Sequence, residues 1–403
     1  METLETKQES RKERKSDIIH LHEIAQDFIK VTDTVARGIY ELSGKGQKEK
    51  ADQIAAQIME ETLNSLPYKI QVLIGEGEKD HSGYGGHRKI LGIPYKEMLD
   101  LEAVIDPLEC TSNFAKGLPD SMSVLLIAEK DTIQAVPKTY MKQLLLPKEV
   151  RDLGKLLFME DKFQELDTEH QELIKKYFYI DIDKEGTSKI HIKKELLDAD
   201  PKEILMLTAL ALHRDISDLT VVVQDRPRHS ELIDRIRELG AGVALIDSGS
   251  ISASAEIIVR KEGRMNLLIG IYGAPEGLIQ AFMAKSTHSI FLGRIQPHNE
   301  KTEIEAEELG ILNQTLNEDE WIKGEAILIM TGIHSSIWLP GIRKVPKKKV
   351  NQKQVSNRSS GLPEAPKGKN HRLMVSTVIW TINNVMLVEL EDGDFRRKEI
   401  IFQ

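Results

Sequence analysis

The sequence predicts an α/β protein, and three of its features support that class. Two segments near the N-terminus carry apolar residues three and four positions apart, which is the repeat of an amphipathic helix. Short apolar runs in the first half of the chain end in acidic residues, as buried strands do when they lead into a polar loop. From Ile204 onward, helix-like and strand-like segments alternate, which is typical of βαβ units on a sheet.

The N-terminal helical pair comes first in the chain. Apolar side chains recur on one helical face between Ile18 and Leu42, and the Gly- and Lys-rich turn SGKGQKEK ends this helix. A second helix is predicted in ADQIAAQIMEETLNSL, with Asp52 in its first turn.

Strands follow the helical pair. KIQVLIGEGEKD is an apolar strand that runs into alternating Gly and Glu, and LDLEAVIDP is a strand that ends in acids. SMSVLLIAEKDTIQAV predicts a hairpin. Later strands are predicted in LTVVVQ, AGVALID, NLLIGIYG and EAILIMTGI, with HSELIDRIRELG as a helix among them. Mixed sheets are therefore expected.

These elements predict how the chain is organised. Highly charged sequence of helical pattern at about residues 147–198 predicts an insertion on the surface. KVPKKKVNQKQVSNRSSGLPEAPKGKN predicts a disordered, solvated linker; its lysines could alternatively attract nucleic acid. The predicted units are a disordered tail at 1–17, a metal-binding α+β half at 18–200 that includes the insertion, an α/β half at 201–343, the linker at 344–370, and a closing hairpin at 371–403.

Composition narrows the class of protein further. The 403 residues carry a formal net charge of −9, which argues against a dedicated nucleic-acid surface, so no nucleic-acid partner is expected. The single cysteine, Cys110, excludes an internal disulfide framework and fits a reducing compartment. The charged N-terminus lacks the apolar core of a secretory signal, and no run approaches the ~20 apolar residues of a membrane span. We therefore expect a cytoplasmic protein with no membrane partner.

Two carboxylates lie close together at the end of LDLEAVIDP. Pro107 stiffens the turn between Asp106 and Glu109. Carboxylates crowded at one strand end raise each other's pKa unless a cation lies between them. Because carboxylate oxygens are the ligands that Mg²⁺ and Mn²⁺ prefer, this turn predicts a metal site.

Further acids are candidates for the same site. Glu76, Glu78 and Asp80 follow the strand KIQVLI, and Asp52 is a third source of carboxylate. Asp52 could instead be a helix-start acid that complements the helix dipole, and Glu78 and Asp80 could be solvated loop acids. Together the acids favour a two-metal hydrolase, in which metals ~3.5–4 Å apart stabilise both oxygens of a phosphoryl transfer. The hydroxyl of Thr111 would orient the attacking water.

Five motifs, IGEGE, IDPLECT, DRPRH, GIYGAPEG and MTGI, occur in the order seen in class II fructose-1,6-bisphosphatases. The chain resembles this family from about His20 to Arg343, apart from the insertion. The resemblance implies the layered α-β-α-β-α fold of the lithium-sensitive, metal-dependent phosphatase superfamily. It also implies a sugar-phosphate substrate, Mg²⁺ or Mn²⁺ as cofactor, and a homo-oligomer.

The resemblance assigns roles position by position. It implies metal ligands at Asp52, Glu76, Asp106, Glu109 and Glu276. It implies a catalytic role in activating water for Thr111, together with Asp52 and Glu76. It implies substrate contacts at Lys48, Glu109, Cys110, Thr111, Tyr140, Arg226, Arg228, Ser248, Ser250 and Glu276.

Several of these assignments have an ordinary alternative. The planar guanidinium groups of Arg226 and Arg228 suit phosphate, although both side chains could simply be solvated. Glu276 could be an acid at a helix start, with the neighbouring Gly and Pro only ending the strand and beginning the helix. His229 has no comparable functional case, and we expect a helix-start or structural residue there.

The chain departs from the family on the side that faces the sugar. Where the family has DGD, this chain has Ser248 and Ser250 around a glycine, and Asp247 stands one residue early. Losing two charge-assisted contacts costs about 1–3 kcal/mol each. Cys110 replaces a glycine, which is tolerable when the backbone angles are ordinary.

The leading hypothesis is a divalent-metal-dependent phosphatase that removes the 1-phosphate of fructose 1,6-bisphosphate, in gluconeogenesis or carbon metabolism. The serines leave other small phosphomonoesters open: sedoheptulose 1,7-bisphosphate, an inositol phosphate or a 3′-phosphonucleotide. A second class is a catalytically weak, regulatory relative that binds a phosphorylated metabolite or partner protein. The retained set of acids argues against that class, because a binding protein has little need of a complete metal cage.

Overall fold

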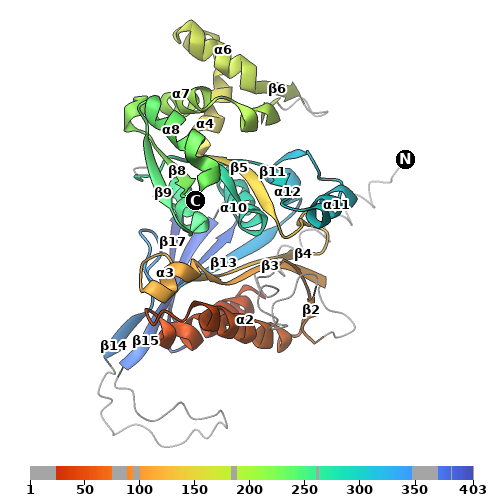
Figure 1. The fold of residues 1–403 in the computed structure, drawn as a ribbon, viewed down its shortest axis with the longest axis vertical. Helices are drawn as coiled ribbons and strands as arrows, with labels where there is room; N and C mark the ends of the chain where they lie inside the picture. Colours follow the sequence, from red (N-terminus) through yellow and green to blue (C-terminus); the bar gives the residue numbers. More distant parts are fainter. Residues whose placement is uncertain are drawn as a thin grey trace, which may run out of the picture.

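The computed structural model describes residues 24–74, 89–93, 100–182, 188–259, 263–346, 371–382 and 384–402. In these residues, two sheets alternate with three groups of helices (Figure 1). The helix at residues 24–39 and α2 cover one face of the larger sheet, α9 and α10 lie between the sheets, and α4, α6, α7 and α8 cover the far face of the smaller sheet. The α-β-α-β-α layering is therefore confirmed.

The larger sheet has nine strands. Along the sheet the strands run in the order β17-β16-β15-β13-β4-β3-β1-β2, with β14 paired to β15. Only β1 and β3 are parallel among the pairs described. The strands are β1 (Lys69–Ile74), β2 (Ile90–Leu91), β3 (Asp100–Glu109), β4 (Met122–Glu129), β13 (Ala326–Gly332), β14 (Arg343–Pro346), β15 (His371–Thr381), β16 (Asn384–Glu391) and β17 (Asp394–Phe402).

The smaller sheet has six strands in the order β12-β11-β5-β10-β8-β9, and it is mixed. Strand β8 pairs in parallel with β9 and β10, as the βαβ pattern predicts, whereas β5 is antiparallel to both of its neighbours. A separate hairpin is formed by β6 and β7. The strands are β5 (Tyr140–Leu146), β6 (Phe178–Ile182), β7 (Ser188–Ile192), β8 (Thr220–Gln224), β9 (Gly242–Ile246), β10 (Leu267–Gly273), β11 (Ile290–Gln296) and β12 (Thr315–Asn317).

The helices begin and end at identifiable signals. Asp200 caps α7 by accepting a hydrogen bond from the backbone N–H of Lys202, and Pro201 occupies the first helical position. Besides the helix at 24–39, the α-helices are α2 (Lys48–Asn64), α3 (Thr111–Lys116), α4 (Lys148–Asp152), α5 (Glu160–Gln164), α6 (Thr168–Tyr177), α7 (Pro201–Leu212), α8 (Ser230–Glu238), α9 (Ser250–Val259), α10 (Ala274–Thr287), α11 (Glu300–Glu308) and α12 (Glu318–Trp321). Short 3₁₀ turns are η1 (Tyr40–Leu42), η2 (Leu153–Phe158), η3 (Lys194–Asp198), η4 (Ile216–Asp218) and η5 (Pro227–His229).

Strand β4 shows why the layers form. Its side chains alternate between two cores: Val124 and Leu126 pack toward α9 and α10, whereas Leu125 and Ile127 pack toward the N-terminal helices. All four are essentially fully buried, and each contributes about 1.5–3 kcal/mol through the burial of apolar surface. A continuous apolar run thus corresponds to a strand covered on both faces.

The N-terminal pair forms as predicted, with one shift in its boundary. The helix at 24–39 buries Phe28, Val35 and Ile39 on the predicted face. Helix α2 begins at Lys48, three residues earlier than expected, so Asp52 lies in its second turn. Because the helix dipole acts within the first turn, the alternative of a helix-start acid loses support.

The charged segment at about 147–198 contains helices, as predicted, and also the hairpin β6–β7. Its apolar side chains Phe163, Leu173 and Phe178 are buried in one cluster with residues of α7 and β8. The segment therefore packs on the smaller sheet and extends its core, although its outer surface is charged.

The hairpin predicted in SMSVLLIAEKDTIQAV is wrong, because only β4 forms there. Both edges of β4 are occupied, by β3 and β13, so an adjacent returning strand has no place. The chain turns away after β4 at Asp131, whose φ is 64°, and the carboxylate of Glu102 accepts the backbone N–H groups of Asp131 and Ile133.

The C-terminal segment is a three-stranded meander rather than the predicted hairpin. A tight turn with positive φ at Asp392 and Gly393 adds β17 to the sheet. Strand β14 begins the segment predicted as a linker, and residues 347–370 lie outside the described part of the chain. The tail predicted at 1–17 also lies outside it.

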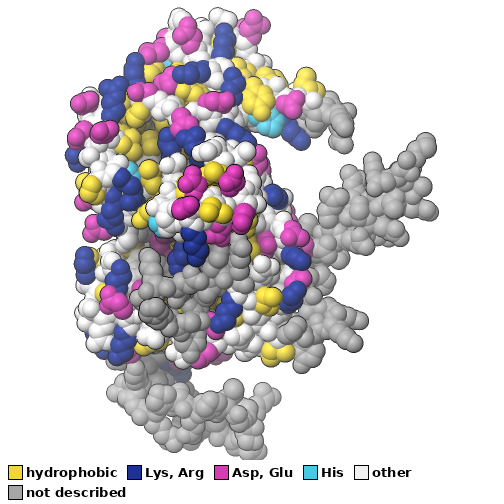
Figure 2. Space-filling view, turned by 45° about the vertical axis from the view of Figure 1, so that its right-hand side comes forward, with side chains coloured by type: hydrophobic (Ala, Val, Ile, Leu, Met, Phe, Trp, Pro, Cys, Tyr) yellow, Lys and Arg dark blue, Asp and Glu magenta, His cyan; other side chains and the backbone are white. Residues whose placement is uncertain are grey.

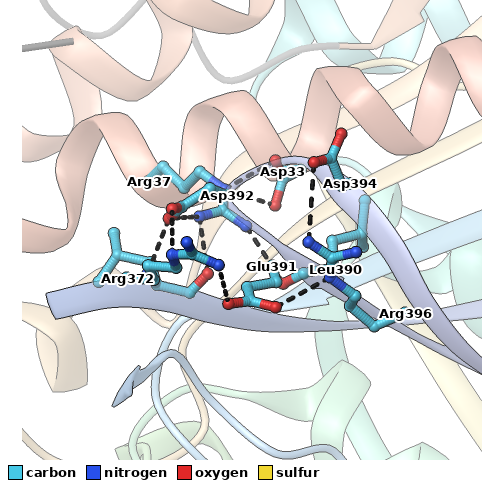
Figure 3. Close-up of polar contacts among 9 residues, drawn as sticks. Asp33, Arg37, Arg372, Leu390, Glu391, Asp392, Asp394 and Arg396 are labelled. Carbon is cyan, nitrogen blue, oxygen red and sulfur yellow. Dashed lines mark hydrogen bonds and ion pairs between the residues drawn. The ribbon is translucent and has the colours of Figure 1, made fainter. Parts of the chain in front are cut away.

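A charged network ties this meander to the N-terminal helix (Figure 3). The Nε of Arg37 lies 2.9 and 2.8 Å from the two carboxylate oxygens of Asp33, and the same guanidinium donates to the carbonyls of Leu373 and Leu390. On the meander, Glu391 pairs with Arg372 and with Arg396. The two ends of the described chain are thereby held on one sheet.

The two sheets exchange strands across the predicted boundary at residue 200. Strand β5 precedes that boundary but lies in the smaller sheet, and β13 follows it but lies in the larger one.

No helix in the described residues is long and apolar enough to cross a membrane. On the face shown in Figure 2, basic and acidic side chains are interspersed rather than gathered into one basic stripe.

Candidate functional site

A β-bulge at the end of β3 brings two acidic side chains to one face. Asp106 pairs with Val124 and Glu109 with Met122, so three residue steps on β3 match two on β4. In a regular strand, residues three apart point to opposite faces; the extra residue restores the same face. Pro107, which lacks an N–H, occupies the bulge, and the N–H of Leu108 donates to Asp106 Oδ1 at 3.2 Å. The structure thus places both carboxylates together, with only 9% and 6% of Asp106 and Glu109 exposed.

Cys110 and Thr111 turn the chain from β3 into α3. Cys110 has φ 65° and ψ 40°, a left-handed conformation that favours glycine, so the condition under which a cysteine would be tolerated there without strain is not met. Burial, followed by the charge of Glu109, raises the pKa of the Cys110 thiol to about 12. Thr111 begins α3, and its hydroxyl donates to the carbonyl of Leu108 at 3.0 Å. The lone pairs of this hydroxyl remain as acceptors for a water molecule.

The altered motif at 248–250 lies against Cys110. The Ser248 hydroxyl and the Cys110 sulfur are 3.1 Å apart. A Cβ on Gly249 would lie 3.0 Å from that sulfur, so the loop passes directly over the end of β3. Ser250 is buried at the start of α9, where its carbonyl accepts the hydroxyl of Ser254. The loop after β9 of the smaller sheet therefore meets the end of β3 of the larger sheet at this point.

Arg226 is held beside the same loop. Its guanidinium donates to the carbonyl of Asp247 at 2.8 Å and to that of Asp225 at 2.6 Å. These contacts fix Arg226 next to Ser248, between the end of β8 and the end of β9. The guanidinium still has further N–H groups to offer a phosphate.

Arg228 and Tyr140 form a second part of the site. The guanidinium carbon of Arg228 lies 4.9 Å from the centre of the Tyr140 ring, and Arg228 also donates to Gln224 Oε1 and to the carbonyl of Ile271. Tyr140, the first residue of β5, is opposite Gly273 on β10. Both Arg228 and Tyr140 are exposed, so a ligand can reach them.

Glu276 lies next to this pair, in the first turn of α10. A Cβ on Gly273 would lie 1.9 Å from Glu276 Oε2, so the carboxylate folds back over the residue that precedes the helix, and a side chain at 273 would displace it from this position. Helix α10 also contacts β3, the strand that carries Asp106 and Glu109. The Gly and Pro of this turn therefore position the acid as well as starting the helix.

His229 has the structural role expected for it. It is buried, accepts the N–H of Ile271 at Nε2, and donates from Nδ1 to the carbonyl of Gln224, which joins the ends of β8 and β10. Burial lowers the pKa of His229, so the ring stays neutral in this arrangement.

Lys48, Asp52 and Glu76 are the remaining predicted residues of the site. Lys48 is exposed at the start of α2, and Asp52 is half-buried on the same helix, which packs against β3 and α3. Glu76 lies within residues 75–88, outside the described residues, as do Glu78 and Asp80. Within the described part of the chain, no three His, Cys, Asp or Glu side chains gather closely enough to hold a metal ion. The complete metal cage thus stays a prediction.

Comparison with known proteins agrees with this geometry. Residues 22–168 and 180–362 match the family described as bacterial fructose-1,6-bisphosphatase, glpX-encoded. The chain belongs to this family. It is similar to the D-fructose 1,6-bisphosphatase class 2/sedoheptulose 1,7-bisphosphatase of Synechococcus sp. (strain JA-2-3B'a(2-13)), with 30% identity over 347 residues that cover 80% of this chain and 88% of the relative. The relative of the same name in Synechococcus elongatus is 30% identical over 345 residues, covering 79% of this chain and 88% of that protein.

Membership confirms the resemblance drawn from the motifs and makes the chain a phosphomonoester hydrolase of a metal-dependent family. The site fits a divalent cation in its chemistry. Asp106 and Glu109 are hard oxygen donors that are mostly buried, and each of them raises the pKa of the neighbouring Cys110 thiol. That effect shows a negative local potential, which a cation would compensate.

Sequence reasoning missed one acid beside the loop 248–250, which is predicted to contact the sugar. Asp120 lies on the loop between α3 and β4, and its Cβ would be 4.0 Å from a Cβ on Gly249. It belongs to none of the five motifs, so only the folded chain brings it to the site.

Proposed function

We propose that the protein hydrolyses the 1-phosphate ester of fructose 1,6-bisphosphate, using Mg²⁺ or Mn²⁺. The observation that carries this proposal is the bulge of β3, which aims Asp106 and Glu109 to one face directly before Thr111. Arg226, Arg228 and Tyr140 stand on the other sheet, where a second phosphate would bind.

Different residues of the proposed site serve hydrolysis and substrate binding. Asp106 and Glu109 would hold a divalent cation, with Asp52, Glu76 and Glu276 as further proposed ligands. When bound, the cation supplies positive charge that polarises the phosphate and lowers the pKa of a water molecule. Thr111, whose own proton is donated to Leu108, accepts a hydrogen bond from the attacking water and so orients it.

The phosphate that is not cleaved binds on the opposite side. The guanidinium groups of Arg226 and Arg228 are preorganised by backbone carbonyls, so little side-chain entropy is lost when they bind phosphate. The guanidinium of Arg228 lies over the Tyr140 ring, and this contact helps to hold the side chain in place. Lys48, which is exposed, is a further proposed contact to substrate.

Sedoheptulose 1,7-bisphosphate is a second candidate substrate. Ser248 and Ser250 replace longer acids, and the shorter side chains leave room for a longer sugar. The relatives described above carry both activities in their names.

A substrate panel tests these proposals. The purified protein is incubated with fructose 1,6-bisphosphate, sedoheptulose 1,7-bisphosphate, an inositol phosphate and a 3′-phosphonucleotide, each with Mg²⁺, Mn²⁺ or a chelator. We expect metal-dependent phosphate release from the sugar bisphosphates. Release from none of them would favour the regulatory metabolite-binding alternative.

The cellular setting and assembly are also proposals. We infer a cytoplasmic homo-oligomer that needs neither nucleic acid nor a membrane, as the family resemblance and the acidic composition suggest. Light scattering after gel filtration measures the subunit number, and a monomer at micromolar concentration would contradict this.

A further inference from the structure

The side of the site that faces the sugar lacks acids at the positions where the family carries them. Ser248 and Ser250 are neutral, and the Ser248 hydroxyl is paired with the Cys110 sulfur at 3.1 Å. Asp247, the nearest acid in the sequence, is exposed, and its backbone carbonyl is what accepts Arg226. A carboxylate for sugar hydroxyls must therefore come from elsewhere in the fold, if the site has one.

Asp120 is placed to supply it. A Cβ built on Gly249 would lie 4.0 Å from the Cβ of Asp120 and 3.0 Å from the Cys110 sulfur. Asp120 and Cys110 therefore both lie close to Gly249. Asp120 thus lies beside the loop 248–250 and close to Cys110, the residue that follows the proposed metal ligand Glu109.

Hydrogen bonds hold this carboxylate in one orientation. The Ser252 hydroxyl donates to Asp120 Oδ1 at 2.9 Å, and the indole N–H of Trp338 lies 3.2 Å from that hydroxyl and 3.1 Å from the Ser252 carbonyl. The donors come from α9 and from the loop after β13, so three separate segments meet at Asp120. Asp120 Oδ2 has no hydrogen bond or ion pair with any residue that the structure describes, and the side chain is only partly buried.

The backbone of Asp120 is also unusual. Its φ is 78°, a left-handed conformation that Asp and Asn tolerate better than other side chains. Burial raises the pKa of Asp120, and the charge of Glu256 adds to that effect, whereas the Ser252 hydroxyl lowers it. The protein therefore keeps an acid in a position that costs stability and gives it a donor that holds it in place.

We propose that Asp120 is a specificity-determining residue that binds the hydroxyl groups of a sugar bisphosphate, in place of the acids missing at 248 and 250. Oδ1 is held by Ser252, and Oδ2 accepts hydrogen bonds from the substrate. Trp338 acts through Ser252 and is a positioning residue. The inference rests on the proposed function, because it assigns a hydroxyl-binding group to the same site.

The test compares a substrate with hydroxyls and an analogue without them. Asp120→Asn keeps the left-handed backbone and the size of the side chain, and removes only the charge and the second acceptor. We expect the KM for fructose 1,6-bisphosphate to rise about tenfold, as for loss of a hydrogen bond to a charged group, with little change in kcat. The inhibition constant of hexane-1,6-diol bisphosphate, which has the phosphates but no hydroxyls, should stay within about twofold.

Two further variants sharpen the result. Asp131→Asn is a matched control, because Asp131 also has a left-handed backbone, at φ 64°, but lies at the far end of β4; its KM should equal that of the wild type. Ser252→Ala, which removes the donor that orients Asp120, should raise the same KM by a smaller factor.

The outcomes separate the two proposals. Equal shifts of the KM and the inhibition constant would show that Asp120 is merely structural, and no shift in either would show that it does not touch the substrate; both overturn the inference alone. If the wild type releases no phosphate from any sugar bisphosphate, the proposed function fails, and the inference fails with it.

Discussion

The two sides of the candidate site differ in how they keep the family's pattern. The hydrolytic side, Asp106, Glu109 and Thr111, has the residues that the family resemblance requires, on a strand end shaped by a proline bulge. The proposed recognition side, Tyr140, Arg226, Arg228, Ser248 and Ser250, keeps the cations that the resemblance implies for phosphate and has serines where it implies acids. We therefore expect the phosphate chemistry and the sugar contacts to change separately.

The difference follows from how each side is built. The hydrolytic side depends on one register shift, and a change there would move both carboxylates at once. The recognition side comes from several segments that meet through single contacts, such as Ser248 with Cys110 and Ser252 with Asp120. A group lost from one of those segments can be replaced by a group from another.

Removing a carboxylate from the hydrolytic side should have the largest effect. Asp106→Asn keeps the shape of the bulge but removes a proposed metal ligand, and we expect kcat to fall by ~10³-fold or more, about 4 kcal/mol in the barrier. Phosphate release at saturating Mg²⁺ or Mn²⁺ measures it. Asp100→Asn, at the half-buried start of the same strand, is the matched control and should keep its rate. If the Asp106→Asn enzyme stays active, Asp106 is not needed for hydrolysis, and the division into a hydrolytic and a recognition side fails.

Changes to the cations of the recognition side should act on binding instead. In Arg228→Ala we expect the KM to rise by about 10–100-fold with kcat nearly unchanged, because phosphate binding there is equal in the ground and transition states. Arg228→Lys should recover little, since lysine can neither stack on Tyr140 nor donate to Gln224 and Ile271 together. A fall in kcat of similar size would place Arg228 on the hydrolytic side.

Cys110 lies between the two sides and allows a test of strain. Its left-handed backbone disfavours any Cβ, so Cys110→Gly should be more stable than Cys110→Ala by about 1 kcal/mol, the reverse of the usual order. Urea unfolding of the two variants measures this difference. If alanine is the more stable, the backbone at the junction is not strained, and the serine loop packs on an ordinary turn.

Much of the fold was predictable because it rests on local pattern. The N-terminal helix follows from apolar spacing, and β4 from a run of residues buried on both faces. The predicted hairpin after β4 failed because both edges of that strand are taken by partners distant in sequence. The turn at Asp392 and Gly393 carried a DG signal for β17 that the sequence interpretation did not use.

The candidate site also contains residues that a local motif predicts and residues that only the folded chain brings together. The proline between Asp106 and Glu109 marked the turn that we propose to bind metal, because a local motif holds both acids. Asp120 was not predictable, since it reaches Gly249 only when α9 and the loop carrying Trp338 fold around it. Tertiary contacts between single residues leave no periodic signal in a sequence.

The smallest effect concerns the contact between the charged insertion and the recognition side. Asp198, at the end of η3, binds Arg294 on β11 through both oxygens and Lys142 on β5, two residues from Tyr140. Hydrogen bonds from Arg294 lower the pKa of Asp198 from its usual 3.8 to about 2. The folded state therefore gains stability from this group above about pH 4 and loses it as the pH falls through about 2.

Because Asp198 is partly exposed, water screens the pair, and Asp198→Asn should cost less than about 1 kcal/mol at pH 7. The cost should shrink toward zero near pH 2, when the wild-type carboxylate is protonated as well. Urea unfolding between pH 2 and 7, with a double-mutant cycle to Arg294→Gln, isolates the interaction. A KM for fructose 1,6-bisphosphate that changes more than twofold in Asp198→Asn would show that the insertion positions Tyr140, and the recognition side would then extend to that contact.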